Sequence, residues 1–253
     1  MRVFAVIKTF VVTEAPVVAR SVFYDEHFSN GEPPLHPSIS YSPNHQEINM
    51  FKRSMQFILT LSTLFFALNC MALDTLVMNK LFHTPNDPSD GNPNASVTVA
   101  EFFDYECSHC VEMAPIVSAI AKENPNVRFV FKEFPIFGET SDFAARASLA
   151  ANKQGKYLNF NHILFSTEHP LTEESILAAA KKAGLNMKQL QTDMKSPAII
   201  KQLHGNIALA QTLKVNGTPA FFFVKTKDNS NYNSILGSMS KSEMQNAINI
   251  TNS

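Results

Sequence analysis

The 253-residue chain has few cysteines, few charged side chains and no excess of charge of either sign. Its three cysteines are too few for a scaffold held by disulfides. The 21 Lys and Arg residues against 22 Asp and Glu residues give a net charge of −1, which argues against a nucleic-acid-binding protein, because that class needs a basic excess or stripe. Hydrophobic residues make up 45% and charged residues 17%, which excludes a disordered or fibrous chain and provides enough apolar material for a core.

The chain also lacks a hydrophobic run of the length that a membrane span usually needs. The run Phe57–Leu68 has twelve residues, whereas a transmembrane helix needs about 20. Two basic residues precede the run and Ala72 follows it, which is the layout of a secretory signal peptide over residues 50–72. Two alternatives are an uncleaved membrane anchor and a lipoprotein that uses Cys70 as the lipid acceptor. We therefore expect export to the periplasm or cell envelope.

A segment of 49 residues stands before this signal, although a signal peptide is expected to begin a chain. We interpret residues 1–49 as the product of a translation start assigned too early, or as a disordered segment. Translation would then begin at Met50 or Met55. The mature protein is expected to comprise residues 73–253.

Hydrophobic patterning predicts a βαβ unit in the first part of the mature chain. An amphipathic stretch at 74–82 predicts a short helix, and the Pro- and Asn-rich stretch 83–94 predicts a loop. Two apolar runs, 96–103 and 127–134, predict buried strands, and a helix over 107–123 connects them. A strand–helix–strand unit with such a short connection implies that its two strands are parallel.

The following residues predict a run of helices and then a ββα block. Helical patterns cover 142–154, 157–165, 172–184, 186–194 and 199–213. Two strands are predicted at 220–224 and 232–236, and a final helix begins at 240. We therefore predict an α/β fold with one mixed sheet, built from residues 73–138 and 215–253. An all-helical insertion, 139–214, is expected to lie outside that sheet.

The chemistry is expected at Cys107-Ser108-His109-Cys110. A Cys-x-x-Cys pair between a strand and a helix is typical of a redox site. A structural disulfide at this spacing would constrain very little of the chain. A zinc site would require further ligands, and the sequence has no second cysteine pair. We expect neither a metal nor another cofactor.

The two sulfurs are expected to play different parts. Cys107 lies where the helix begins, so unpaired N–H groups and the helix dipole favour its thiolate, and we expect it to be the exposed, attacking sulfur. Cys110, one turn later, is expected to be buried and to resolve the mixed disulfide. His109 can supply a cation or a hydrogen-bond donor. Thr218-Pro219, just before an apolar strand, gives a second signal: a strand-start proline fits there whether its peptide bond is cis or trans.

Taken together, Glu101–Cys110, Phe129–Pro135, the helical insertion and Val215–Phe221 resemble the DsbA-like thiol oxidoreductases of bacteria. That family has a thioredoxin fold with an inserted helical domain. The resemblance implies that Pro219 is cis and covers about residues 74–250.

The resemblance also implies the role of each site residue. Cys107 would be the nucleophile, Cys110 the resolving thiol and His109 a group that stabilises the thiolate. Thr218 would tune reactivity beside the cis proline. Glu101 matches the buried acid of the family and is expected to pair with Lys132 and to relay protons to Cys110. Ser108 and Thr218 differ from the Pro and Val of the best-known oxidases, and a Thr before the cis proline resembles the isomerase-type relatives.

Two classes of function follow from these observations. The first is an enzyme that oxidises or reshuffles thiols of exported proteins and is recycled by a membrane redox partner. We expect this enzyme to bind no nucleic acid. We also expect it to be a monomer, or a small homodimer formed through residues 76–82. The alternative is a structural or adhesive envelope protein with a secondary redox site. Whether an enzyme of this kind is an oxidase, an isomerase or a reductase is not decided by these residues.

Overall fold

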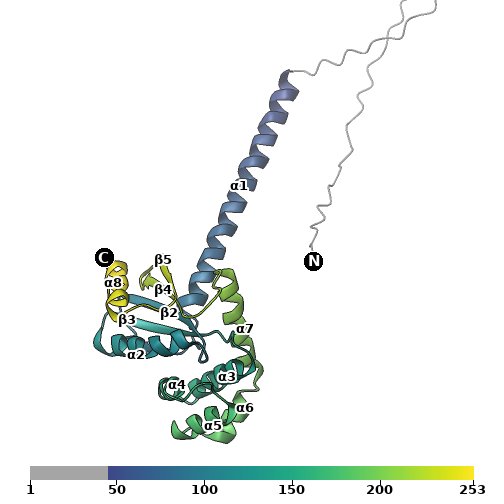
Figure 1. Ribbon diagram of the computed structural model, residues 1–253. Coiled ribbons are helices and arrows are strands. Elements are labelled where there is room, and N and C mark those ends of the chain that lie inside the picture. The colour runs from purple at the N-terminus through teal and green to yellow at the C-terminus, as the bar shows by residue number, and fades with distance from the viewer. Residues whose placement is uncertain (1–44) are drawn as a thin grey trace, which may run out of the picture. The chain divides into compact units, whose positions relative to one another are not determined.

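The computed structural model describes residues 45–253, apart from the side chains of 45–48, 51, 64, 66–74 and 228–231. The prediction for the upstream segment 1–49 therefore falls mostly outside the described residues. Two units can be distinguished, 1–55 and 56–253, and the fold and the site described below belong to the second (Figure 1).

The first helix, α1 (His45–Phe82), corrects the prediction of a separate short helix at 74–82. The stretch 45–82 contains neither glycine nor proline, so nothing in it interrupts a helix. Among the described residues, no helix is both long enough and apolar enough to cross a membrane. The signal peptide at 50–72 remains a prediction.

The sheet has five strands in the order β1-β3-β2-β4-β5. The strands are β1 (Ser89–Gly91), β2 (Val97–Phe103), β3 (Val127–Glu133), β4 (Ala220–Lys225) and β5 (Asp228–Leu236). The β2–β3 pair is parallel, and every other pair is antiparallel. The predicted α/β fold with a mixed sheet is therefore confirmed.

Strand β1 is the element that sequence patterning missed, because it lies within the predicted loop 83–94. Its three residues have no β-branched or aromatic side chain, so the pairing with β3 supplies what local preference does not. Gly91 has φ +89°, and a Cβ there would lie 2.6 Å from the Val127 carbonyl oxygen. Glycine is thus required where this edge strand meets β3.

The helices match the predicted order closely. They are α2 (Ser108–Glu123), α3 (Glu139–Lys153), α4 (Tyr157–Phe165), α5 (Glu173–Lys182), α6 (Met187–Asp193), α7 (Pro197–Thr212) and α8 (Lys241–Asn252). Thr172 and Ser240 form capping boxes at the starts of α5 and α8. Helices α3–α6 gather beside α2 and away from the sheet (Figure 1).

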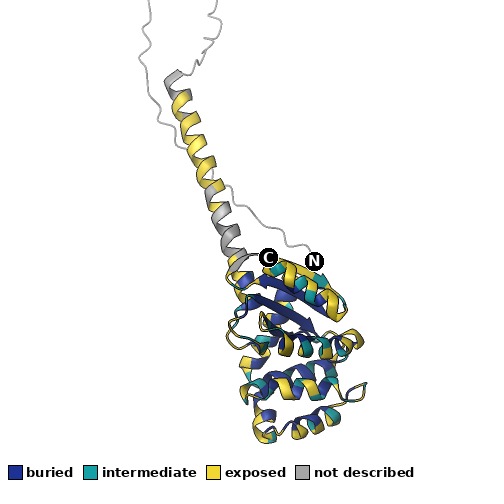
Figure 2. Cartoon of the chain, turned by 90° about the vertical axis from the view of Figure 1, so that its left-hand side faces the viewer, coloured by how far each residue is buried: buried dark blue, intermediate teal, exposed yellow. Residues whose placement is uncertain are grey.

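The three central strands, β2, β3 and β4, are buried on both faces of the sheet along most of their length (Figure 2). One face packs with α2, α8 and the insertion in a single apolar cluster, and the other packs against α1 and the end of α7. Leu81 and Phe82 are fully buried on that second face. They cannot form the predicted dimer contact, because they fill the protein's own core, whereas Leu76 is exposed.

Candidate active site

Cys107 occupies the N-cap of α2, as its position after a buried strand predicts. Its backbone is extended, with φ −80° and ψ 114°, and its carbonyl oxygen accepts hydrogen bonds from the N–H groups of Cys110 and Val111 at 2.9 and 3.0 Å. No side chain caps the helix through Cys107. The first N–H groups of α2 therefore remain available to favour negative charge at this end of the helix.

The Cys107 sulfur lies against the segment that carries the predicted special proline. The Thr218–Pro219 peptide bond is cis, and Cys107 Sγ donates a hydrogen bond to the Thr218 carbonyl oxygen at 3.2 Å. This contact joins residues 111 positions apart in the chain. It also corrects the expectation of an exposed nucleophile, because the contact leaves Cys107 only 4% exposed.

Cys110 is fully buried, as predicted, and both cysteines are free thiols. Burial raises the pKa of the Cys110 thiol strongly, and Glu101 and Cys107 raise it further when they are ionised. The Thr218 hydroxyl lies near enough to lower that pKa slightly, although it makes no geometrically defined hydrogen bond. Cys110 therefore holds its proton much more tightly than an ordinary thiol does.

His109 and Ser108 lie on the exposed first turn of α2. His109 Nδ1 is 3.4 Å from Glu112 Oε2, and the two side chains are 61% and 67% exposed. The ring is thus engaged with a carboxylate one turn along the helix. Its predicted action on the Cys107 thiolate stays a prediction.

The predicted Glu101–Lys132 pair is wrong, and the register of the sheet explains why. Glu101 pairs with Phe131, and Phe102 pairs with Lys132. Side chains alternate between faces along a strand, so the Glu101 and Lys132 side chains point to opposite faces of the sheet. Lys132 instead forms an ion pair with Asp87, and both side chains are 1% exposed.

Glu101 lies on the same face as α2 and borders a cavity. Burial raises the pKa of its carboxyl from 4.5 to about 8, so the group is largely protonated at neutral pH. The cavity has a volume of about 70 Å³, several times the 10–15 Å³ or more that one water needs. It extends from Glu101 to the exposed residues Ser118 and His162. The buried acid therefore borders a cavity that is large enough for water and reaches the surface.

Asp104 is a site residue that sequence reasoning did not identify. One carboxylate oxygen accepts hydrogen bonds from the Glu106 N–H at 2.8 Å and the Ser141 hydroxyl at 2.7 Å. The other accepts from the N–H groups of Ile136 and Phe137 at 2.6 and 3.1 Å. This carboxylate fastens the loop before the cysteines to the start of the insertion. An acid directly after a buried strand was the available signal.

A buried polar cluster behind the cysteine loop was also missed. Glu133 Oε1 accepts hydrogen bonds from the hydroxyls of Tyr105 and Tyr157 at 3.2 and 2.7 Å, and Asn161 donates to the Tyr105 hydroxyl at 3.0 Å. Burial raises the pKa of Glu133 well above its ordinary value, and the hydrogen bonds from Tyr157 and Tyr105 offset part of that rise. The cluster joins the cysteine loop to α4.

The insertion also holds the cysteine loop through its own loop between α4 and α5. The His169 ring Nε2 lies 2.8 Å from the Tyr105 carbonyl oxygen. The Leu171 N–H donates to Glu106 Oε1 at 2.7 Å. Together with Asp104, these contacts fix the position of Cys107 relative to both parts of the protein.

Residues 98–249 match the DSBA-like thioredoxin domain. A thioredoxin-like oxidoreductase from Silicibacter pomeroyi DSS-3 is 41% identical, with a TM-score of 0.63 over 68% of this chain and 95% of that one. A probable disulfide bond formation protein D of Bacillus anthracis is 28% identical over 64% of this chain and 81% of that protein. The Na⁺/H⁺ antiporter NhaA of Herminiimonas arsenicoxydans is 29% identical over 52% of this chain. The matched part spans only 21% of the antiporter's length.

Proposed function

The chain belongs to the DSBA-like thioredoxin family, and from this premise we propose that it is a thiol-disulfide oxidoreductase. It exchanges disulfides with the thiols of exported proteins, chiefly as an oxidase. The observation that carries the proposal is the Cys107 sulfur at the N-terminus of α2, 3.2 Å from the carbonyl oxygen of the residue before the cis proline. Export rests on the signal-peptide pattern at 50–72. We also propose isomerase activity, because a Thr before the cis proline resembles the isomerase-type relatives.

The exchange begins with the protein in its disulfide form. A substrate thiolate attacks Cys107 Sγ, the Cys107–Cys110 bond breaks, and Cys110 leaves as a thiolate that takes up a proton. A second substrate thiolate then attacks the substrate sulfur of the mixed disulfide and releases the Cys107 thiolate. Two electrons pass from the substrate dithiol to the cysteine pair, and a membrane redox partner that accepts them restores the disulfide.

The surroundings of each sulfur suit these steps. The helix N-terminus favours the Cys107 thiolate as the group that is released. Burial gives Cys110 a raised pKa, so its leaving thiolate needs a proton donor close by. Glu101, with a pKa of about 8, is protonated at neutral pH and has a cavity path to solvent. We assign it the role of supplying that proton and, in the reverse direction, of accepting it.

The test uses oxidative refolding of a reduced, unfolded protein, together with insulin reduction. Cys107→Ser is expected to abolish both activities, because it removes the sulfur that forms the mixed disulfide with the substrate. Glu112→Gln, an exposed change on the same helix, serves as the matched control and should retain most of the activity. Full activity in Cys107→Ser would refute the redox assignment. Envelope association unaffected by the loss of Cys107, in a protein without catalytic activity, would favour the structural alternative.

A further inference from the structure

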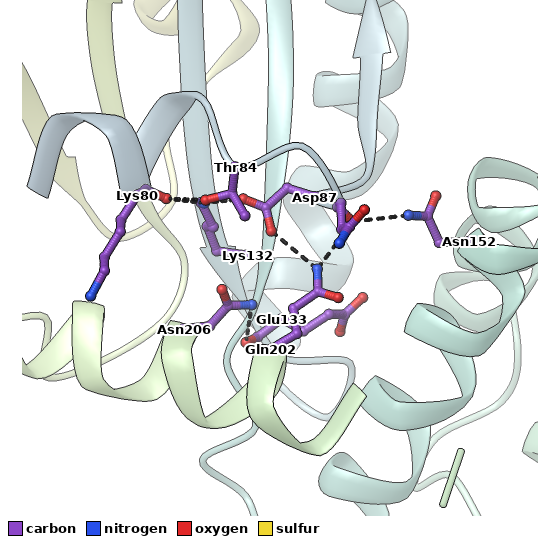
Figure 3. Close-up of polar contacts among 9 residues, drawn as sticks. Lys80, Thr84, Asp87, Lys132, Glu133, Asn152, Gln202 and Asn206 are labelled. Atoms are coloured by element: carbon purple, nitrogen blue, oxygen red, sulfur yellow. Dashed lines mark hydrogen bonds and ion pairs between the residues drawn. The ribbon is translucent and has the colours of Figure 1, made fainter. Parts of the chain in front are cut away.

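A second hollow, which we call the α3–α7 groove, shares no lining residue with the cysteine site. It lies between the loop 84–87 that follows α1, the end of α3 and the first three turns of α7 (Figure 3). Its volume is about 630 Å³. Sites for small ligands usually enclose about 300–1,000 Å³, so the groove has the size of a binding site for a small molecule or a short peptide.

The negative charge at the floor of the groove is already neutralised. Asp87 forms its ion pair with Lys132 beneath the surface. Gln202 Nε2 donates to the other Asp87 oxygen and to the Asn86 carbonyl oxygen, both at 3.1 Å. Asn152 Nδ2 donates to the same carbonyl oxygen at 3.1 Å. The floor is therefore held in place by hydrogen bonds, and Asp87 does not repel an anion.

Three side-chain amides use only their N–H groups in the protein. Asn206 Nδ2 donates to the Glu133 carbonyl oxygen at 3.2 Å, and Asn152 and Gln202 donate to the floor as described (Figure 3). Within residues 45–253, their carbonyl oxygens have no hydrogen-bond partner in the protein. Asn206 lines the groove although it is only 5% exposed. A ligand that carries N–H or O–H donors can therefore pair with these acceptors.

The rim of the groove is positively charged. Lys80 on α1 and Lys201 on α7 are exposed, and neither side chain has an acidic partner in the described part of the chain. Lys153 also lines the groove, but it pairs with Asp193. Apolar side chains complete the walls: Leu149, Ile199 and Leu209. Two uncompensated cations above acceptors and apolar walls favour a ligand that is anionic at one end and apolar along its length.

We propose that the α3–α7 groove binds the C-terminal end of a polypeptide. The terminal carboxylate lies between Lys80 and Lys201, backbone N–H groups donate to the amide oxygens of Asn152, Gln202 and Asn206, and an apolar side chain packs on the walls. A peptide end combines a carboxylate, N–H donors and apolar surface in one extended segment. The proposal goes beyond the disulfide exchange and does not depend on it.

The test compares two probes on the full chain by titration calorimetry: the peptide acetyl-Leu-Gly-Leu with a free carboxylate, and the same peptide as its C-terminal amide. The carboxylate form is expected to bind at least tenfold more tightly. The double variant K80Q/K201Q should remove that difference, whereas K181Q/K182Q, on α5, should preserve it. Equal binding of the two peptides, or no binding of either, would overturn the proposal.

Gly205 offers a second variant that blocks the groove without disturbing the fold. It lines the groove on α7, and a Cβ at this position meets no heavy atom within 4 Å. Gly205→Trp should therefore fill the groove and abolish peptide binding, while disulfide exchange continues at the wild-type rate. Ala208→Trp, at an exposed α7 position outside the groove, is the matched control and should bind normally. Wild-type peptide affinity in Gly205→Trp would place the binding elsewhere and contradict the assignment.

Discussion

Replacing Glu101 by glutamine is expected to stabilise the protein at neutral pH and to remove much of the pH dependence of its stability. Glu101 is 4% exposed, and burial raises the pKa of its carboxyl from 4.5 to about 8. Between these two values the unfolded chain has released the proton and the folded protein has kept it. Folding must therefore take up a proton, and the free energy of unfolding falls as pH rises from about 4.5 to about 8.

The size of the effect follows from the same two values. One pKa unit corresponds to about 1.4 kcal/mol. Since pH 7 lies about two and a half units above 4.5, holding the proton on Glu101 costs about 3 kcal/mol at that pH. Below pH 4.5 both states are protonated and the cost vanishes. Glutamine has nearly the same shape and no charge to lose, so Glu101→Gln should recover most of the 3 kcal/mol.

Urea unfolding of the reduced protein at several pH values from 4 to 9 measures this effect. The wild-type unfolding free energy should decline through the neutral range, and that of Glu101→Gln should decline less steeply, since the raised pKa of Glu133 still contributes in the variant. Glu112→Gln is the control, because that side chain is 67% exposed and its removal should leave the decline unchanged. Parallel pH profiles for wild type and Glu101→Gln would refute the assignment of a raised pKa through burial.

Three further predictions concern the thiols and the buried ion pair. Iodoacetamide should modify Cys107 faster than Cys110 in the reduced native protein, because Cys110 is fully buried and burial raises its pKa; equal rates would contradict this. His109→Leu should make the reduction potential more negative by about 30 mV for each tenfold loss of thiolate stability, and an unchanged potential would show that the ring does not act on the sulfur. Asp87→Asn should lower the unfolding free energy by about 3–5 kcal/mol, because it leaves the buried Lys132 without its counter-charge. A loss below about 1 kcal/mol would show that the ion pair does not stabilise the fold.

Most secondary structure could be predicted because its causes lie within a few residues. The apolar runs of β2 and β3, the N-cap Thr172 of α5 and the N-cap Ser240 of α8 are local signals. Each depends on neighbours at most four positions away. Strand β1 escaped prediction because three residues of low strand preference are held only by their pairing with β3.

The contacts between distant residues could not be predicted in the same way. Glu101 and Lys132 stand on adjacent strands, and only the register shows that they face opposite sides of the sheet. The actual partner of Lys132, Asp87, lies in a loop whose path the sequence does not reveal. A shift of one residue in register would reverse the faces, so a pairing of buried charges cannot be read from spacing alone.

By itself, the sequence determined the chemistry of this protein: two thiols at the start of a helix, with a proline before a later strand. These features are local, since a Cys-x-x-Cys spacing and a helix N-terminus act within one turn. Only the tertiary structure decided that Cys107 is covered by the Thr218 carbonyl group, that Glu101 borders a cavity that reaches the surface, and that α3 and α7 line a second groove. The contact between Cys107 and Thr218 joins residues 111 positions apart. Relations of this kind depend on how the sheet and the helices pack rather than on the order of residues along the chain.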